Sequence, residues 1–168
     1  MHVVRRLGPW QAVPMAGPVY AGGNVMKVWK WRDLFGRPEP EAPRRTKPGR
    51  QQQRYDCLVD EMKKQWSIRI HRWRDRTSGC AWELRDRDGQ VTRMIESPYP
   101  RGPVSCAVFL HEVGHHAIGF GIHRLRCMEE HLAWEWAIRQ MEARGFNVTD
   151  RVRHRREQAM RYALAKAL

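Results

Sequence analysis

The residues best suited to chemistry in this chain are His111, Glu112 and His115, which form a His-Glu-x-x-His pattern. Residues four apart lie on the same face of a helix, so the two imidazoles could hold one metal ion between them. The glutamate beside the first histidine could then accept a proton from a water that the metal activates. The pattern therefore predicts a metal site, and the elements around it must decide whether it carries chemistry.

The segment 105–119 is predicted to be the helix that carries this pattern, with a glycine at 119 or 121 ending it. At about 100° per residue, the two histidines lie together on one side of this helix. The opposite side is apolar and consists of Cys106, Leu110, Val113 and Ala117. We expect this apolar side to pack on the domain and the imidazoles to face a cleft. Gly114 leaves room near the metal face for another backbone.

A catalytic zinc site needs a third protein ligand and an open position for water. A metzincin would carry a histidine six residues after His115, but Gly121 stands there, which excludes that class. The next predicted helix, residues 126–144, has an apolar face made of Ala133, Trp134, Ala137, Ile138 and Met141. Glu130 lies in the middle of that face, where an unpaired carboxylate would be costly to bury and a metal would stabilise it. We therefore predict Glu130 as the third ligand.

Several alternatives to this assignment stay open. Glu129 projects about 100° away from Glu130 on the same helix and is the next candidate. His131 and His123 follow, although His123 lies just past glycines that leave its direction undefined. Glu130 could also serve no metal and instead pair with an arginine such as Arg126.

The elements before the motif are predicted from hydrophobic periodicity. Helical spacing of Tyr55, Leu58, Val59 and Met62 predicts a first helix that ends near residue 66. Polar and bulky residues then alternate over 67–73, 80–85 and 91–95, with a hairpin turn at Asp88-Gly89. We expect three antiparallel strands in a meander, and overall an α+β fold.

A final helix is predicted after Thr149, which is a good N-cap residue. Its apolar stripe consists of Val152, Ala159, Met160, Ala163 and Ala167, with Arg156 among them. Arginines at 151, 153, 155, 156 and 161 surround this stripe. We expect the helix to pack on the domain with its basic face in solvent.

Composition indicates one compact domain with a basic tail. The chain has 168 residues, 42% of them hydrophobic, and a net charge of +13. Residues 1–54 hold 11 Lys/Arg against 3 Asp/Glu, and prolines recur between positions 36 and 53. We therefore predict a disordered basic, proline-rich tail and linker over 1–53 and a folded domain over 54–168. Translation starting at Met26 rather than Met1 is a further hypothesis, because residues 1–25 show no periodicity.

Cysteine spacing and hydropathy bear on the compartment. Cys57, Cys80, Cys106 and Cys127 form no Cys-x-x-Cys pair, which disfavours a zinc ribbon or a thioredoxin-like centre. With no export signal evident, we expect reduced thiols, several of them in the core, and a cytoplasmic protein. No run of 18 apolar residues occurs, so no membrane segment is expected.

Two segments together resemble a known family. His111 to His116, followed by Glu130-x-x-Ala133-x-x-Trp136-Ala137, is similar to the small gluzincin-type metallopeptidase domains of phages and mobile elements, such as the ImmA/IrrE family. The resemblance covers about residues 54–145. It implies a minimal zincin-like domain: a helix, a small sheet, an active-site helix and a glutamate-bearing helix. In ImmA-like members the substrate is a repressor, an identity that does not carry over here.

The combined hypothesis is a zinc-dependent metallopeptidase acting on a protein or peptide. Zinc held by His111, His115 and Glu130 would activate a water, and Glu112 would act as general base. The further donors to the substrate carbonyl that we consider are His116, His123, Tyr99 and Tyr162. An outer strand of the sheet could bind an extended peptide.

The alternative is a zincin-fold protein with little or no peptidase turnover. Such a protein would bind nucleic acid, through its basic tail and C-terminal helix, or would regulate a partner. A protease of the SprT type, acting on DNA-bound proteins, is disfavoured because no later zinc-ribbon cysteine set follows.

Overall fold

A computed structural model describes residues 38–43 and 46–167, so the hypothesis about Met26 lies outside the described residues. The described part contains four helices and one three-stranded sheet, and the predicted α+β class is confirmed. The elements in chain order are α2 (Arg50–Trp66), β1 (Ile68–Arg74), β2 (Cys80–Arg85), β3 (Val91–Pro98), α3 (Pro103–Ile118), α4 (Arg126–Ala143) and α5 (Asp150–Ala165).

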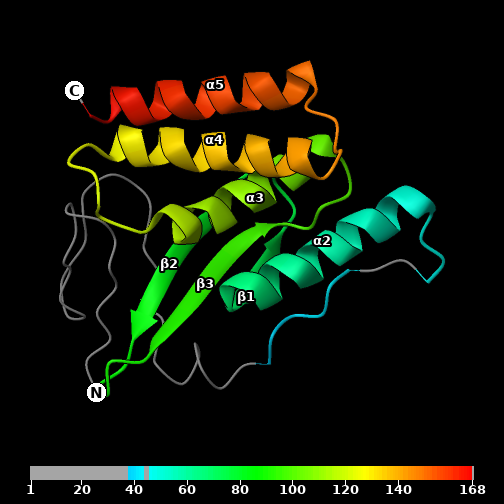
Figure 1. Cartoon of the computed structure of the whole chain (residues 1–168), viewed down its shortest axis with the longest axis horizontal. Helices are drawn as coiled ribbons and strands as arrows, with labels where there is room; N and C mark the ends of the chain where they lie inside the picture. The colour runs from blue at the N-terminus through cyan, green and yellow to red at the C-terminus, as the bar shows by residue number, and fades with distance from the viewer. Residues whose placement is uncertain (1–37, 44–45, 168) are drawn as a thin grey trace.

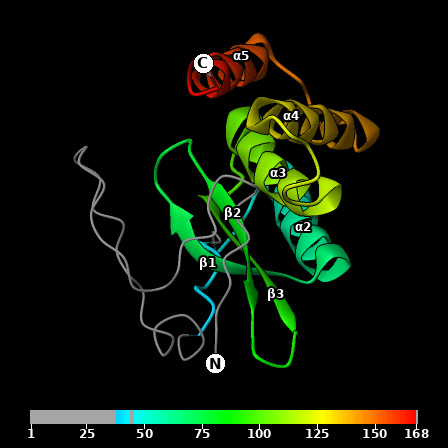
Figure 2. The ribbon, with the colours of Figure 1, turned by 90° about the vertical axis from the view of Figure 1, so that its left-hand side faces the viewer.

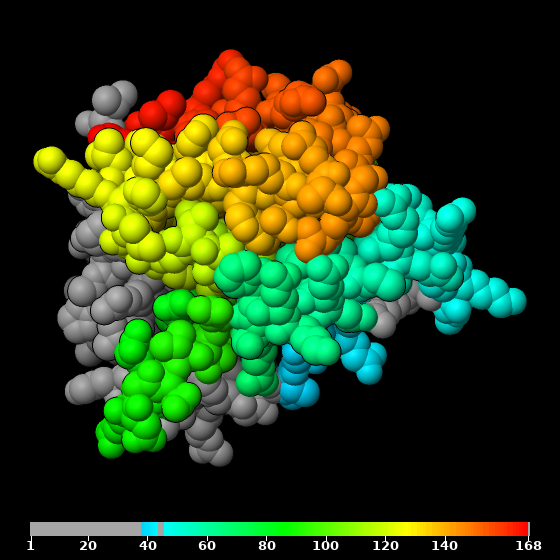
Figure 3. All heavy atoms as spheres, in the orientation of Figure 1, coloured from blue at the N-terminus to red at the C-terminus, as the bar shows by residue number. Residues whose placement is uncertain are grey.

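The helices are stacked in layers on one face of the sheet. α2 and α3 lie against the sheet, α4 packs on α3, and α5 packs on α4 and runs antiparallel to it (Figure 1 and Figure 2). α3 is the central element, because every residue from Cys106 to His116 is buried. Side chains of α2 and α4 cover most of it in the space-filling view (Figure 3). The motif helix is therefore held from several sides.

The sheet differs from the predicted meander. β2 and β3 form the expected antiparallel hairpin, in which Gly89 adopts a φ of 80° and Asp86 Oδ1 accepts the backbone N–H of Gln90 at 2.8 Å. β1, however, pairs with β3 in parallel, which gives the strand order β1-β3-β2. The antiparallel meander is thus wrong and the sheet is mixed. β3 carries the longest buried run, Met94 to Pro98, and such a strand belongs in the middle.

The first helix buries the predicted residues, Tyr55, Leu58, Val59 and Met62. It begins at Arg50, four residues before the domain boundary that we predicted at residue 54. The boundary itself stays a prediction. Part of the predicted linker touches the domain: Glu39 Oε1 accepts the N–H of Ile70 at 3.2 Å and lies 2.6 Å from Lys63 Nζ.

The helix at the end of the chain is capped as predicted, with Thr149 Oγ1 accepting the N–H of Val152 at 3.4 Å. Among the cysteines only Cys106 is buried, so the expectation of several core thiols is wrong. Within the described residues, we find no helix whose length and hydropathy would let it cross a bilayer.

Candidate metal centre

A glycine brings the two helices of the site together. A Cβ at Gly114 would lie 2.9 Å from the carbonyl oxygen and 3.3 Å from the Cα of Ala133, so α4 approaches α3 through the missing side chain. Ala133 is itself completely buried. The prediction that Gly114 makes room for another backbone is confirmed. Glu130, one turn before Ala133, is thereby carried to the histidines of α3.

The three residues predicted as ligands converge. One nitrogen or oxygen of each of His111, His115 and Glu130 lies within 4.8 Å of the others. Glu130 Oε2 lies 3.2 Å from His111 Nε2 and 3.7 Å from His115 Nε2. Ligand atoms about 2.1 Å from a tetrahedral metal would be roughly 3.4 Å apart, and the two separations from Glu130 Oε2 are close to this value.

The ring of His111 is fixed by packing. It stacks on the indole of Trp134 at 4.4 Å between ring centroids, with only 19° between the planes. Its Nδ1 is buried and has no hydrogen-bond partner among the described residues. Trp134 follows Glu130 by one turn of α4, so this helix both supplies the carboxylate and orients the first imidazole.

The alternative ligands lie elsewhere. Glu129 is buried and lines the cleft but is not part of the cluster. His131 lies 3.5 Å from Arg156, and His123 does not line the cleft. The contact between Glu130 and Arg126 is also present, at 3.4 Å through the other carboxylate oxygen. Glu130 can therefore face the histidines with one oxygen and the arginine with the other.

The protonation states of Glu130 and His111 suit metal binding, whereas that of His115 does not. Burial disfavours charge on Glu130, but the contacts with His111 and His115 outweigh burial and lower the pKa of its carboxyl. Burial lowers the pKa of His111 to about 4 despite the contact with Glu130. An ionised carboxylate beside a neutral imidazole is the state in which both groups can ligate zinc. Burial also lowers the pKa of His115, but the contact with Glu130 and its charge together have the larger effect, so the pKa of His115 is raised.

Glu112 lies against the loop that precedes β2. A Cβ at Gly79 would be 2.4 Å from Glu112 Oε1 and 2.5 Å from its Cγ, so only glycine leaves space for this carboxyl. Burial raises the pKa of Glu112 to about 7, while His115, Arg74 and Arg155 act in the lowering direction. A carboxyl poised near neutral pH suits a general base.

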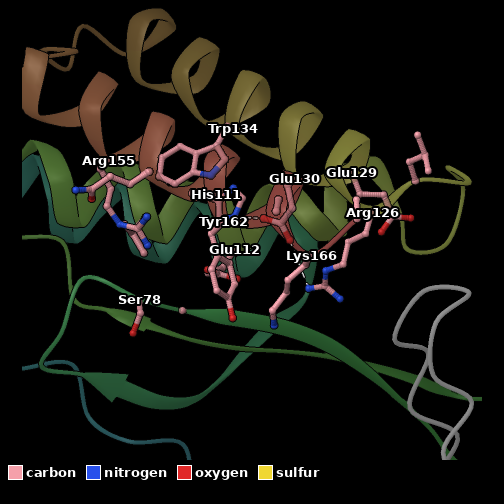
Figure 4. A pocket seen from close by; sticks show the side chains of 17 residues that line it. Ser78, His111, Glu112, Arg126, Glu129, Glu130, Trp134, Arg155, Tyr162 and Lys166 are labelled. Atoms are coloured by element: carbon pink, nitrogen blue, oxygen red, sulfur yellow. Dashed lines mark hydrogen bonds and ion pairs between the residues drawn. The ribbon is translucent and has the colours of Figure 1, made fainter. Parts of the chain in front are cut away.

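A cleft of about 700 Å³ opens in front of these residues. His111, Glu112 and Glu130 line it together with Ser78, Gly79 and Trp134, and residues of α5 form its other wall (Figure 4). Of the donors considered for the carbonyl oxygen, Tyr162 lines this cleft. His116 instead contacts the carbonyl oxygen of Met94 at 3.1 Å, and Tyr99 donates to Asp56 at 2.6 Å.

Two arginines near the site were missed by the sequence analysis. Arg74, from β1, lies 2.7 Å from Glu96 and 3.3 Å from the hydroxyl of Ser78. Arg155, from α5, lines the cleft and donates through Nε to the carbonyl oxygen of Thr77 at 3.1 Å. Arg155 had been assigned to the solvated basic face of its helix. Arg155 lies on the same face of the helix as Ala159 and Tyr162, and this spacing could have indicated that it faces the domain.

Comparison of the chain with protein-family models, with curated proteins and with solved structures found no match.

Proposed function

We propose that this protein is a zinc-dependent metallopeptidase of the gluzincin type. The observation that carries the proposal is the convergence of two imidazoles and one carboxylate within 4.8 Å at the wall of an open cleft. Two histidines and a glutamate are the donor set of one class of catalytic zinc site. The buried Glu112 beside them adds the general base that hydrolysis needs. A cytoplasmic location remains part of the proposal.

Each protein group has a defined role in the proposed reaction. His111, His115 and Glu130 hold the metal, and a bound zinc would supply the Lewis acid that polarises the scissile carbonyl. Glu112 accepts a proton from the attacking water at its carboxylate and returns it to the departing amine. Gly79 lets the loop close over Glu112 and exclude solvent from it. The resulting chemistry is hydrolysis of a peptide bond.

An extended substrate would lie along β2 in this proposal. β2 is at an edge of the three-stranded sheet, and among the described residues only β3 pairs with it. Ser78 and Gly79, which lead directly into β2, line the cleft. Backbone groups of an edge strand commonly bind an added strand. Such a strand would present its peptide bonds to the cluster on α3 and α4.

The first test is the metal content of the purified protein. We expect about one zinc per chain in the wild type, almost none in Glu130→Ala, and full content in the control Glu129→Ala. The control removes a neighbouring buried carboxyl that lies outside the cluster. Zinc that persists in Glu130→Ala, or that is lost from both variants, would contradict the assignment of the third ligand.

The second test is hydrolysis of a fluorescein-labelled casein as a general unstructured substrate. Glu112→Gln should retain its zinc but lose activity by about a thousandfold or more, because the amide cannot accept the proton. Casein hydrolysis that survives this substitution would contradict the proposed role of Glu112 as general base. A wild-type chain that holds zinc but cleaves nothing would favour a regulatory or nucleic-acid-binding role.

A further inference from the structure

The wall of the cleft opposite the metal ligands is one face of α5. Arg155, Ala159, Tyr162 and Lys166 all line the cleft, and their spacing of four, three and four residues places them on one stripe, with Lys166 as the C-cap of α5. We call these four residues the α5 stripe. It carries a cation at each end, with a small and an aromatic side chain between them. This arrangement gives the cleft a defined chemistry on the side away from the metal.

The two cations of the stripe have no acidic partner among the described residues. The guanidinium of Arg155 lies over the ring of Trp134 at 5.9 Å and donates to a backbone carbonyl oxygen. The ammonium of Lys166 lies over the ring of Tyr162 at 4.6 Å. In both cases the contact is with an aromatic ring, which does not neutralise the positive charge as an ion pair would.

Two other arginines of α5 form ion pairs. Arg156 pairs with Glu135, and Arg161 pairs with Glu157 at 2.6 Å. Elsewhere on the cleft, Arg126 is paired with Glu130. Within the part of the chain that the structure describes, the positive charge that lines the cleft without an ion pair is therefore that of the α5 stripe.

The position of the stripe sets where it would touch a bound chain. Arg155 and Lys166 lie on either side of Glu112 in the close view (Figure 4). Eleven residues of helix span roughly 16 Å, which is about the length of five residues of extended peptide. A peptide crossing the cleft past Glu112 would meet one cation before the reacting bond and one after it.

We infer that the α5 stripe selects a peptide segment with acidic residues on both sides of the bond to be cleaved, an inference that rests on the proposed function. Carboxylates of the segment would pair with Arg155 and Lys166, and an apolar side chain would lie on Ala159 and Tyr162. A nucleic acid fits the cleft less well. It carries a phosphate at every nucleotide, and the carboxyls of Glu112 and Glu129 line the space between and beside the cations.

The test measures binding by the zinc-loaded Glu112→Gln protein, which cannot consume its ligand. The probes are three fluorescein-labelled peptides of twelve residues that alternate Leu with Glu, Gln or Lys. Fluorescence anisotropy should show the Glu peptide binding at least tenfold more tightly than the Gln peptide, with the difference shrinking as salt increases. Arg155→Gln and Lys166→Gln should each weaken binding of the Glu peptide by about fivefold.

The matched control is Arg153→Gln, which removes the same charge from an exposed position on the same helix. It should change affinity by less than about twofold, whereas Arg155→Lys should keep most of the binding of the Glu peptide. Equal losses in Arg153→Gln and Arg155→Gln would overturn the inference, because the attraction would then be general. Equal affinity for the Glu and Lys peptides would also overturn it.

A twelve-nucleotide oligothymidylate serves as the competitor. If it binds more tightly than the Glu peptide and depends on Arg155 and Lys166, the stripe is a nucleic-acid site and the inference is wrong. The peptidase activity and the selectivity of the stripe can be tested separately. Binding of the Glu peptide that depends on the stripe, together with a wild-type chain that cleaves neither this peptide nor casein, would refute the peptidase and leave the selectivity intact.

Discussion

The two walls of the cleft are built in different ways. The metal wall consists of α3 and α4, whose backbones meet at Gly114 and Ala133 and whose facing residues are buried. The opposite wall consists of α5 and the loop before β2, joined by a hydrogen bond between Arg155 and Thr77, which are 78 residues apart in sequence. The first wall is held by close packing. In the second wall α5 buries a single residue, Val152, and a polar contact at the surface joins the helix to the loop.

This difference separates two requirements of a hydrolase. Metal ligands must be held to within fractions of an ångström, and buried helix packing provides that precision. Residues that recognise a substrate need not be held so tightly, and exposed segments can change without disturbing the core. We therefore expect changes in the metal wall to alter zinc binding, and changes in the α5 wall to alter selectivity and turnover.

Among substitutions that leave the metal ligands and Glu112 unchanged, Gly79→Ala should have the largest effect, because it acts where the two walls meet at Glu112. The new Cβ would overlap both Oε1 and Cγ of this side chain and displace the base. We expect casein hydrolysis to fall by about 100-fold while zinc content stays at the wild-type level. Gly49→Ala is the control, since a Cβ there meets nothing within 4 Å. Loss of zinc in Gly79→Ala would show that the loop also supports the metal wall.

The substitution Gly114→Ala should instead weaken the metal wall, and so reduce zinc binding and stability. Its Cβ would press on the backbone of Ala133 at 2.9 Å, and backbone cannot move aside as a side-chain end can. We expect a loss of about 1–3 kcal/mol in the free energy of unfolding and weaker zinc binding by about tenfold, because Glu130 moves with α4. Urea unfolding and competition with a zinc chelator measure the two effects. Zinc affinity equal to that of Gly49→Ala would mean that helix approach does not position the third ligand.

The difference between the walls also explains what the sequence could predict. The spacing of His111 and His115 and the place of Glu130 on an apolar helix face are local patterns, and they predicted the cluster that the structure assembles. The helices and the β2–β3 hairpin were predicted for the same reason. The partner of β1 and the contact of Arg155 with residue 77 depend on tertiary packing, which periodicity does not encode.

The substitution Glu112→Gln should make the metal-free protein more stable at high pH. Burial raises the pKa of Glu112 to about 7, above its value of about 4.3 in an unfolded chain. The folded state therefore binds this proton more tightly, and stability is lost as pH rises through this interval. Relative to the wild type, Glu112→Gln should gain on the order of 1–3 kcal/mol between pH 5 and pH 8. Chemical unfolding at both pH values, with zinc chelated, measures this difference.

The control for that measurement is Glu142→Gln, which removes a carboxyl from the exposed side of α4. A gain in stability equal to that of Glu112→Gln would show that the trend reflects net charge and not the buried base. A constant difference between wild type and Glu112→Gln at both pH values would show that Glu112 is more hydrated than its burial indicates.

The substitution Thr149→Ala should have the smallest effect and tests whether the α5 wall is independent of the metal wall. It removes the side-chain oxygen that accepts the N–H of Val152, at a cost of about 1 kcal/mol in the free energy of unfolding. Thr149→Ser keeps the cap and should restore most of this stability. Zinc affinity should match the wild type in both variants, because His111, His115 and Glu130 lie on α3 and α4. If zinc affinity falls with the cap, then α5 holds the ligands as well as the substrate, and the two walls act as one unit.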